Sequence, residues 1–161
     1  MHLPHVFART LVASALAASI GCSSSGVQVP VQPLAEAQSM RLSSGMTIHQ
    51  RLVIRDASTW SMVWLQIVGS HRPIPPVPAV DFTTSTVLVA AMGVRPTGGY
   101  AIAIDEVELH ADAAAIAVDE QSPGPGCVVT ASETTPVAVV VVPSFRGEAT
   151  FLEHMSQLTC R

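Results

Sequence analysis

The stretch Pro136-Val-Ala-Val-Val-Val-Val-Pro143 decides the fold class of this chain. Six consecutive apolar residues without polar alternation predict a β-strand that must be fully buried, because such a segment aggregates when it is exposed. The proline at each end limits the strand and stops it from extending, as gatekeeper residues do. The sequence therefore predicts a buried β-strand over residues 137–142.

Six other segments have the apolar runs or the alternation that indicate strands. They are Met46–Ile54, Thr86–Met92, Tyr100–Leu109, Ala113–Glu120, Cys127–Ser132 and Ala149–Met155. The turn His110-Ala-Asp112 predicts a hairpin between two of them. Four apolar residues in the first arm of this hairpin predict a buried face, with a slip in register near Asp105-Glu106: Tyr100, Ile102, Ile104 and Val107.

One helix is expected between the first two of these segments. Asp56 offers a carboxylate as N-cap, and Gly69 ends the pattern. Between them, apolar residues recur at i, i+3, i+4 and i+7 and predict one buried stripe of about three turns. The stripe consists of Trp60, Val63, Trp64 and Ile67. Four prolines within residues 73–78 then predict a rigid, extended connector.

Six or seven strands and one helix near the start predict a mainly β domain with a minor α+β character. We expect an antiparallel sandwich or a small barrel, with the helix covering one open face or end. Because 48% of the residues are apolar and only 4% are aromatic, the core must consist mainly of Val, Ala, Leu and Ile. We place this single domain at residues 46–161.

The first residues predict export and attachment of a lipid. Arg9, the apolar run over residues 10–20 and Gly21 have the pattern of a secretory signal peptide over residues 1–21. The run is about half as long as a transmembrane helix needs to be. Gly21-Cys22 resembles a bacterial lipobox that makes Cys22 the lipidated first residue, although Ser19 stands where leucine is usual. A plain secretory signal and an uncleaved anchor are the alternatives.

The segment that follows Cys22 predicts how the domain is attached. Residues 22–45 contain Ser, Gln, Pro, Gly and Ala without a sustained period, and so predict a flexible, lipidated tether. We expect the protein in the cell envelope, anchored by its lipid on the periplasmic side or at the cell surface.

The other two cysteines predict a disulfide. With Cys22 lipidated, Cys127 and Cys160 remain in an oxidising compartment, where we expect them to pair; two free thiols are the alternative. Neither cysteine has a second Cys or a His at the spacing of zinc ligands, so no metal site is predicted.

The charge of the chain argues against nucleic acid as a partner. Lysine is absent, and without Arg9 seven arginines face twelve acidic residues, a net charge of about −5. Binding to nucleic acid requires clustered positive charge. Attachment to a membrane would therefore depend on the lipid rather than on charge.

The sequence has no signature of catalysis or of a cofactor. The patterns G-x-S-x-G, S-x-x-K and H-E-x-x-H do not occur, and no two histidines have the spacing of metal ligands. Neither Gly98-Gly99 nor Gly124-Pro-Gly126 opens a helix, and no lysine could reach a phosphate. We expect no catalytic residues and no cofactor, and hence a protein that is not an enzyme.

Two loops have unusual conformational requirements. Gly93–Tyr100 and Ser122–Cys127 combine glycines, which permit positive φ, with prolines, which restrict the backbone. Rigid loops on a β scaffold often bind partners. The alternative is that both loops only connect strands.

Several motifs occur in a characteristic order. They are Trp60-x-x-x-Trp64, Val80-Asp-Phe82, Val87-Leu-Val-Ala-Ala-Met-Gly93, Arg95-Pro-Thr-Gly-Gly-Tyr100, Pro123-Gly-Pro-Gly-Cys127 and Thr134-Thr-Pro136. This order resembles the PrcB C-terminal domain family, named after the protease complex subunit PrcB. The core of the resemblance spans roughly residues 85–143, and a looser similarity covers residues 46–160.

The resemblance implies a secreted or lipid-anchored bacterial protein. The namesake of the family is an accessory lipoprotein that associates with a surface protease and supports that complex. We therefore expect a non-enzymatic lipoprotein whose β domain binds another envelope or secreted protein, as the accessory subunit of a protease complex. The binding-loop candidates are Arg95, Pro96, Thr97, Gly98, Gly99 and Tyr100. A protease inhibitor that uses this loop and an envelope protein that binds a small ligand are the alternatives.

Overall fold

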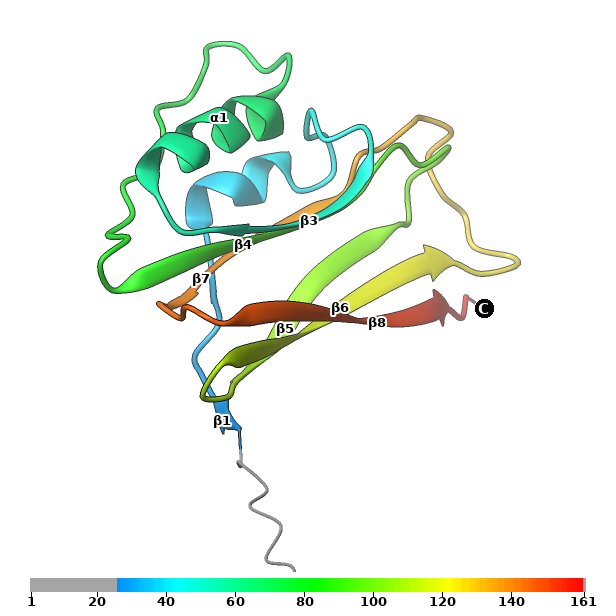
Figure 1. The fold of residues 1–161 in the computed structure, drawn as a ribbon. Helices are drawn as coiled ribbons and strands as arrows, with labels where there is room; N and C mark the ends of the chain where they lie inside the picture. The colour runs from blue at the N-terminus through cyan, green and yellow to red at the C-terminus, as the bar shows by residue number, and fades with distance from the viewer. Residues whose placement is uncertain (1–25, 161) are drawn as a thin grey trace, which may run out of the picture.

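Residues 26–160 are described by a computed structural model, in which two four-stranded β-sheets form a sandwich (Figure 1). In chain order the elements are β1 (Val27–Gln28), β2 (Gln32–Pro33), the 3-10 helix η1 (Ala35–Met40), β3 (His49–Ile54), α1 (Ala57–Val68), β4 (Ser85–Met92), β5 (Ala101–Leu109), β6 (Ala113–Pro123), β7 (Val137–Pro143) and β8 (Glu148–Leu158). The mainly β fold is confirmed, and it is a sandwich rather than a closed barrel.

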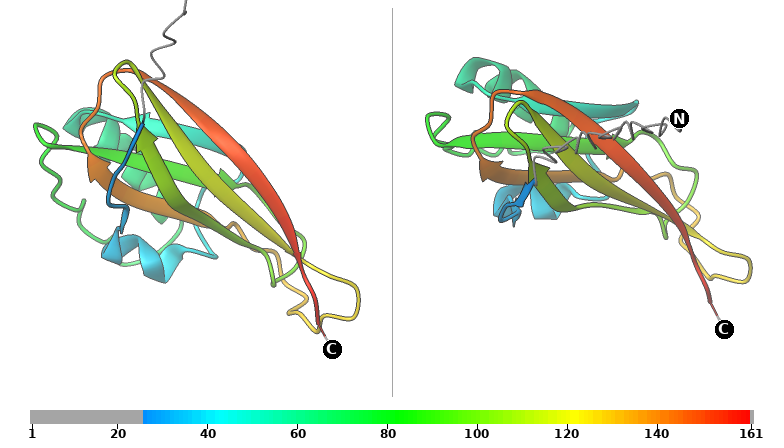
Figure 2. Two further views of the ribbon diagram at one scale, coloured as in Figure 1. Left: turned by 90° about the horizontal axis from the view of Figure 1, so that it is seen from below. Right: turned by 60° about the horizontal axis from the view of Figure 1, so that its bottom comes forward.

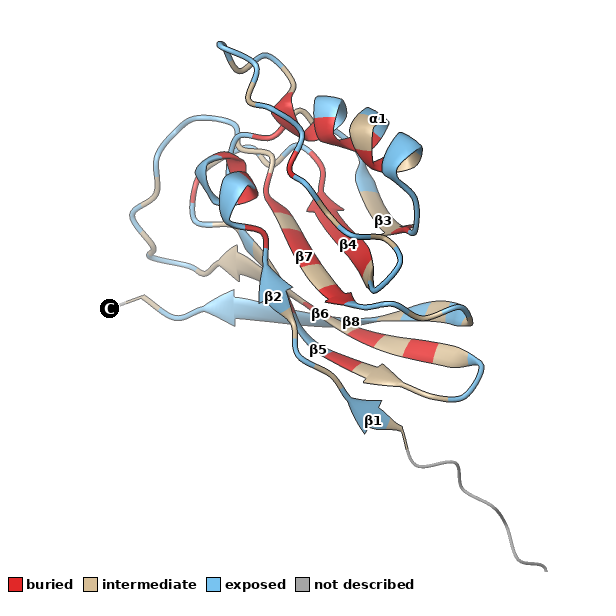
Figure 3. Ribbon diagram, turned by 90° about the vertical axis from the view of Figure 1, so that its left-hand side faces the viewer, coloured by how far each residue is buried: buried red, intermediate tan, exposed pale blue. Residues whose placement is uncertain are grey.

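The two sheets differ in what covers them. The sheet with strand order β2-β7-β4-β3 lies between α1 and the other sheet, and we call it the covered sheet. The sheet with strand order β1-β5-β6-β8 has one face on the covered sheet and its other face towards solvent, and we call it the open sheet. Figure 3 shows the contrast, with buried residues concentrated in β4 and β7 and exposed residues along β8.

Two apolar layers hold the sandwich together. Val87, Val89 and Ala91 of β4 face α1, whereas Leu88 and Ala90 face the open sheet. Successive residues of a strand point to opposite faces, so a strand that is covered on both sides has to be apolar throughout. The predicted buried strand β7 pairs with β4 along its whole length, which confirms it as an inner strand.

Helix α1 begins and ends where the sequence predicts. The carboxylate of Asp56 accepts a hydrogen bond from the backbone N–H of Thr59 at 2.9 Å and so caps the helix. Gly69, with a φ of 57°, ends it in a backbone conformation that favours glycine. All four residues of the predicted stripe are buried: Trp60, Val63, Trp64 and Ile67.

The two tryptophans tie α1 to the proline-rich connector. The indole N–H of Trp60 donates to the carbonyl oxygen of Pro78 at 2.9 Å, and that of Trp64 donates to the carbonyl oxygen of Pro75 at 3.2 Å. Prolines have no N–H to donate, but their carbonyls satisfy the buried indoles. The connector therefore completes the core as well as linking α1 to β4.

The open sheet confirms the predicted hairpin and adds a parallel pair. Strands β5 and β6 are antiparallel, and their register shifts between Ile104 and Glu106, where the sequence predicts a slip. Strand β8 runs parallel to β6 over eleven pairs, from Ala113↔Glu148 to Pro123↔Leu158. This pair departs from the antiparallel arrangement that the sequence predicts.

The predicted tether is wrong for residues 26–45. Strand β1 joins the open sheet and β2 joins the covered sheet, while Ala37 and Met40 of η1 are buried. The sequence shows no period here because the segment crosses from one sheet to the other and spends only two residues in each. The folded domain therefore includes residues before 46.

A second correction concerns the predicted strand Cys127–Ser132, which is a loop. The segment leaves the sheet after β6 because Gly126, with a φ of 82°, turns the chain away and a disulfide fixes it there. The predicted signal peptide over residues 1–21 and the lipidation site Cys22 lie outside the described residues. Among residues 26–160, no helix has the length and apolar character to cross a membrane.

Candidate functional site

The two loops with unusual sequence come together at one end of the sandwich. The backbone of Arg95 exchanges hydrogen bonds with that of Thr134, at 2.7 and 2.9 Å, and Gly98 N–H donates to the carbonyl oxygen of Thr130 at 3.0 Å. We call this end, formed by residues 93–100 and 122–135, the loop end. Figure 2 shows the second of these segments, in yellow, extending beyond the sheets beside the end of β8.

The paired glycines are required by this contact. Gly98 is buried, and a Cβ there would collide with the hydroxyl of Thr130. Gly99 has a φ of 83°, and a Cβ there would lie 2.7 Å from Cγ1 of Val129. The Gly-Gly sequence therefore lets one loop pack against the other, and any larger residue has to separate them.

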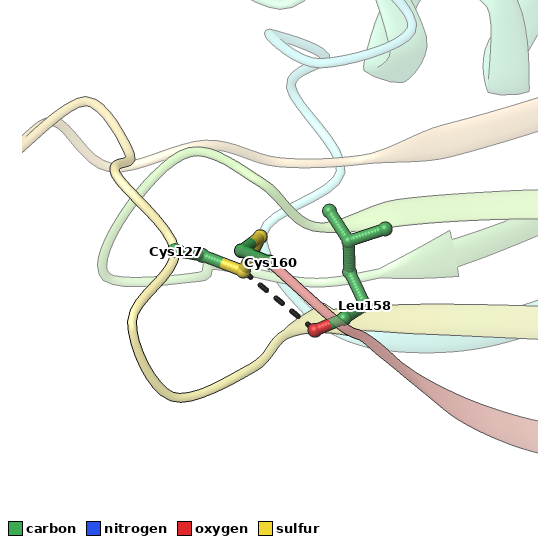
Figure 4. The surroundings of a disulfide bond; sticks show 3 residues. All are labelled: Cys127, Leu158 and Cys160. Carbon is green, nitrogen blue, oxygen red and sulfur yellow. Dashed lines mark hydrogen bonds between the residues drawn. A yellow bond between two sulfur atoms is a disulfide. The ribbon is translucent and has the colours of Figure 1, made fainter.

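A disulfide fixes the loop end to the last strand. Cys127 and Cys160 are bonded, with their Cα atoms 5.0 Å apart and a sequence separation of 33, which confirms the predicted pair. In Figure 4 the Sγ atom of Cys127 lies 3.6 Å from the carbonyl oxygen of Leu158, at the end of β8. The bridge thus holds the second loop against β8.

The binding-loop candidates are exposed to different degrees. Pro96 and Gly99 are exposed, Arg95, Thr97 and Tyr100 are partly buried, and Gly98 is buried. Around them, Val94 is 44% exposed and Val128 is fully exposed. The structure brings the candidates together at one end of the sandwich. Segment 93–100 packs against segment 122–135 there and exposes only part of its surface, so it does not project as a separate loop.

A charge cluster around one buried carboxylate lies behind the loop end, and it was not predicted from the sequence. Glu120 of β6 is only 6% exposed. Its carboxylate accepts a hydrogen bond from Arg51 of β3, lies 3.1 Å from Nε2 of His49, and has Arg95 at 3.7 Å. Glu153 of β8 accepts two bonds of 2.8 Å from the same Arg51 guanidinium.

The alternation along β6 carries the signal for this cluster. Ala114, Ile116 and Val118 point into the sandwich, and Glu120 is the next residue on that face. A carboxylate on an otherwise apolar face needs a partner, because burial of an unpaired charge is costly. Which cation pairs with it depends on β3, 69 residues away in the chain, and no local pattern contains that information.

The cluster has the residue types of a metal site but is built as an ion-pair network. Ligand atoms of His49, Glu120 and Glu153 lie within 4.8 Å of one another. The guanidinium of Arg51 already bridges both carboxylates, so it occupies the place of a cation. Its hydrogen bond holds the pKa of Glu153 below the usual range, and the two carboxylates outweigh burial and raise the pKa of Arg51.

The fold and the loop end define a β-sandwich domain with a preorganised surface at one end. The profile of the PrcB C-terminal family matches residues 86–143, from the start of β4 to the end of β7. The match confirms the resemblance seen in the sequence and fits, at a coarse level, a subunit associated with a protease complex. No curated protein and no solved structure matches the chain.

Proposed function

We propose that this protein is a non-enzymatic lipoprotein of the cell envelope, anchored through Cys22, whose sandwich domain binds another envelope or secreted protein. In this proposal it serves as the accessory subunit of a protease complex. The observation that carries the proposal is the extent of the family match. Residues 86–143 run from β4 to β7 and contain both segments of the loop end.

The geometry of the loop end supports binding to a protein surface. Its two segments are joined by backbone hydrogen bonds and by a disulfide, so little conformational entropy is lost when a partner docks. The exposed Val94 and Val128 supply apolar contact beside the polar rim. A loop whose central glycine is buried is suited to such a surface contact more than to insertion into a protease cleft.

The position of the first described residues supports the anchored arrangement. Val27 pairs with Leu109 of β5, whereas the loop end adjoins Ala101, at the other end of the same strand. Nine residues of extended strand separate the two ends by about 30 Å. A lipid anchor on the N-terminal side would therefore leave the loop end directed away from the membrane.

Affinity capture of the tagged, full-length protein from its own envelope, after chemical crosslinking, tests the proposal. We expect a secreted or surface protease as the main stoichiometric partner in the mass spectrum. The matched pair Val128→Asp and Met62→Asp places one charge at the loop end and one on the exposed side of α1. Only Val128→Asp should reduce recovery of the protease.

Two further variants separate the anchor from the binding surface. Cys22→Ala should release the protein from the membrane fraction and abolish labelling by a palmitate analogue, while binding to the partner survives. The double variant Gly98→Val/Gly99→Val should abolish binding or folding, because the two loops can no longer pack together. Recovery of no specific partner, or equal recovery with Val128→Asp, contradicts the proposal.

A further inference from the structure

Strand β8 has a long edge that no other described strand covers. It pairs with β6 on one side over eleven residues, and it is the last strand of the open sheet on the other. Residues 152–158 are all exposed, including Leu152 and Met155. Natural sheets usually protect such an edge with proline, lysine or a bulge, because its free N–H and C=O groups pair readily with another strand.

A groove runs beside this edge, between β8 and the edge strand β3 of the covered sheet. It has a volume of about 760 Å³, and Val53 of β3 and Phe151 of β8 contribute its apolar surface. The Arg51–Glu153 bridge joins the two strands, so it limits the groove on the side of the loop end. An extended chain that adds to β8 would place alternate side chains in this groove.

Arginines are concentrated in the groove. Arg51, Arg55 and Arg146 line it, and these are three of the seven arginines that follow Cys22 in a chain of net negative charge. Arg55 and Arg146 also line an adjoining hollow of about 430 Å³, which contains serine and threonine hydroxyls and no carboxylate.

The charges of two of these arginines are not neutralised by the described residues. Arg55 donates to the carbonyl oxygens of Phe145 and Gly147, at 3.1 and 2.8 Å, and lies over the ring of Phe145. Within residues 26–160, neither Arg55 nor Arg146 forms an ion pair. The backbone contacts fix the head of Arg55, so that it is preorganised to receive a carboxylate.

We infer that the free edge of β8 takes an extended segment of the partner protein by strand addition, and that an acidic side chain of this segment binds Arg55 and Arg146. The inference rests on the proposed function, because it names a second contact made by the same partner. Strand addition supplies affinity through the backbone, and the groove supplies specificity through alternate side chains. Asp112 and Glu148 line the hairpin side of the groove. Their carboxylates repel an acidic residue there, so it can bind only beside Arg55 and Arg146.

A second copy of this chain is a poorer occupant than an acidic partner segment. Strand β8 carries Glu148 and Glu153 and contains no arginine or lysine. Pairing of β8 with β8 of a second copy would bring the carboxylates of both strands to one edge, where Arg51 is already paired with Glu153 of its own chain. Like charges in neighbouring strands are unfavourable.

Site-specific photocrosslinking in the native envelope tests the inference. Benzoylphenylalanine replaces Leu152 or Met155 on β8, Val128 at the loop end, and Leu65 on the exposed side of α1 in the full-length protein. We expect the two β8 positions to crosslink to one extended segment that contains Asp or Glu, and Leu65 to give no adduct. The crosslinked peptides are identified by mass spectrometry.

Arginine variants supply the matched control. Arg146→Gln, alone and combined with Arg55→Gln, should lower the yield at Leu152 by about tenfold, the effect of losing a charge-assisted contact. Arg72→Gln should not, although Arg72 also donates to backbone carbonyls. Arg146 makes no hydrogen bond within residues 26–160, so its replacement does not threaten the fold.

The outcomes separate this inference from the proposed function. Adducts at Val128 without adducts on β8 overturn the inference and leave the proposed function standing, and no adduct at any position overturns both. Adducts from β8 to a second copy of the chain, or a yield that Arg146→Gln does not change, also overturn the inference.

Discussion

The covered sheet and the open sheet each have four strands, but their environments are opposite. In β4, seven of eight residues are buried, whereas β8 has no buried residue among its eleven. The covered sheet buries many of the apolar residues of the chain and packs against α1. The open sheet contributes the two carboxylates of the charge cluster, has the disulfide beside the ends of β6 and β8, and has the free edge. One sheet thus provides stability and the other provides surface, and changes in each should have different consequences.

The largest loss of stability should follow removal of a tryptophan from the covered side. Trp64 is completely buried, so Trp64→Ala should lower the free energy of unfolding by about 3–5 kcal/mol. Urea denaturation measures the change. Leu65→Ala, next to it on the exposed side of α1, is the control and should have little effect. A loss below about 1 kcal/mol in Trp64→Ala would contradict the account of this core.

Removal of the disulfide should act on the open sheet. The bond links two residues with a sequence separation of 33, so replacing Cys127 and Cys160 with alanine should lower the free energy of unfolding by about 3–4 kcal/mol. Hydrogen exchange should increase in residues 124–135 and at the end of β8, while β4 and β7 stay protected. An equal increase in both sheets would show that the two regions do not differ in this way.

Truncation of Arg51 should destabilise the protein, because it leaves the buried carboxylate of Glu120 without its main cationic partner. Arg51→Met leaves this carboxylate with only His49 and Arg95 nearby, so the free energy of unfolding should fall by about 3 kcal/mol. In the double variant Arg51→Met/Glu120→Leu the buried charge is absent, and part of the loss should be recovered. If the double variant is as unstable as the sum of the two single variants, the pair does not couple.

The covered sheet was more predictable from the sequence than the open sheet, and the reason is the range of the interactions. Strands β4 and β7 and the ends of α1 follow from local patterns, namely apolar runs between breakers and a capped stripe. The parallel pairing of β8 with β6 and the two-residue strands β1 and β2 depend on distant partners. Short strands without a period therefore resembled a tether.

The candidate site also contains features that follow from local sequence and features that depend on distant partners. The Cys127–Cys160 pair and the glycine loop were predicted, because residue type alone restricts them. The Arg51–Glu120–Glu153 cluster joins three strands that are far apart in the chain, and only Glu120 breaks a local pattern. The arginine groove likewise exists only once β3 and β8 lie at the same side of the sandwich.

The smallest effect should be a dependence of stability on pH that arises at the bridge between the two sheets. The hydrogen bond from Arg51 lowers the pKa of Glu153 below its ordinary value of 4.5, so the bridge stabilises the folded state above that value. This stabilisation is lost as the pH falls from about 4.5 through the lower pKa of the folded state. Glu153→Gln should therefore be less stable than the unmodified protein at pH 7, and the difference should shrink below pH 4.5. In the Arg51→Met background the difference at pH 7 should be much smaller, and a difference that is unchanged there would assign it to something other than this bridge.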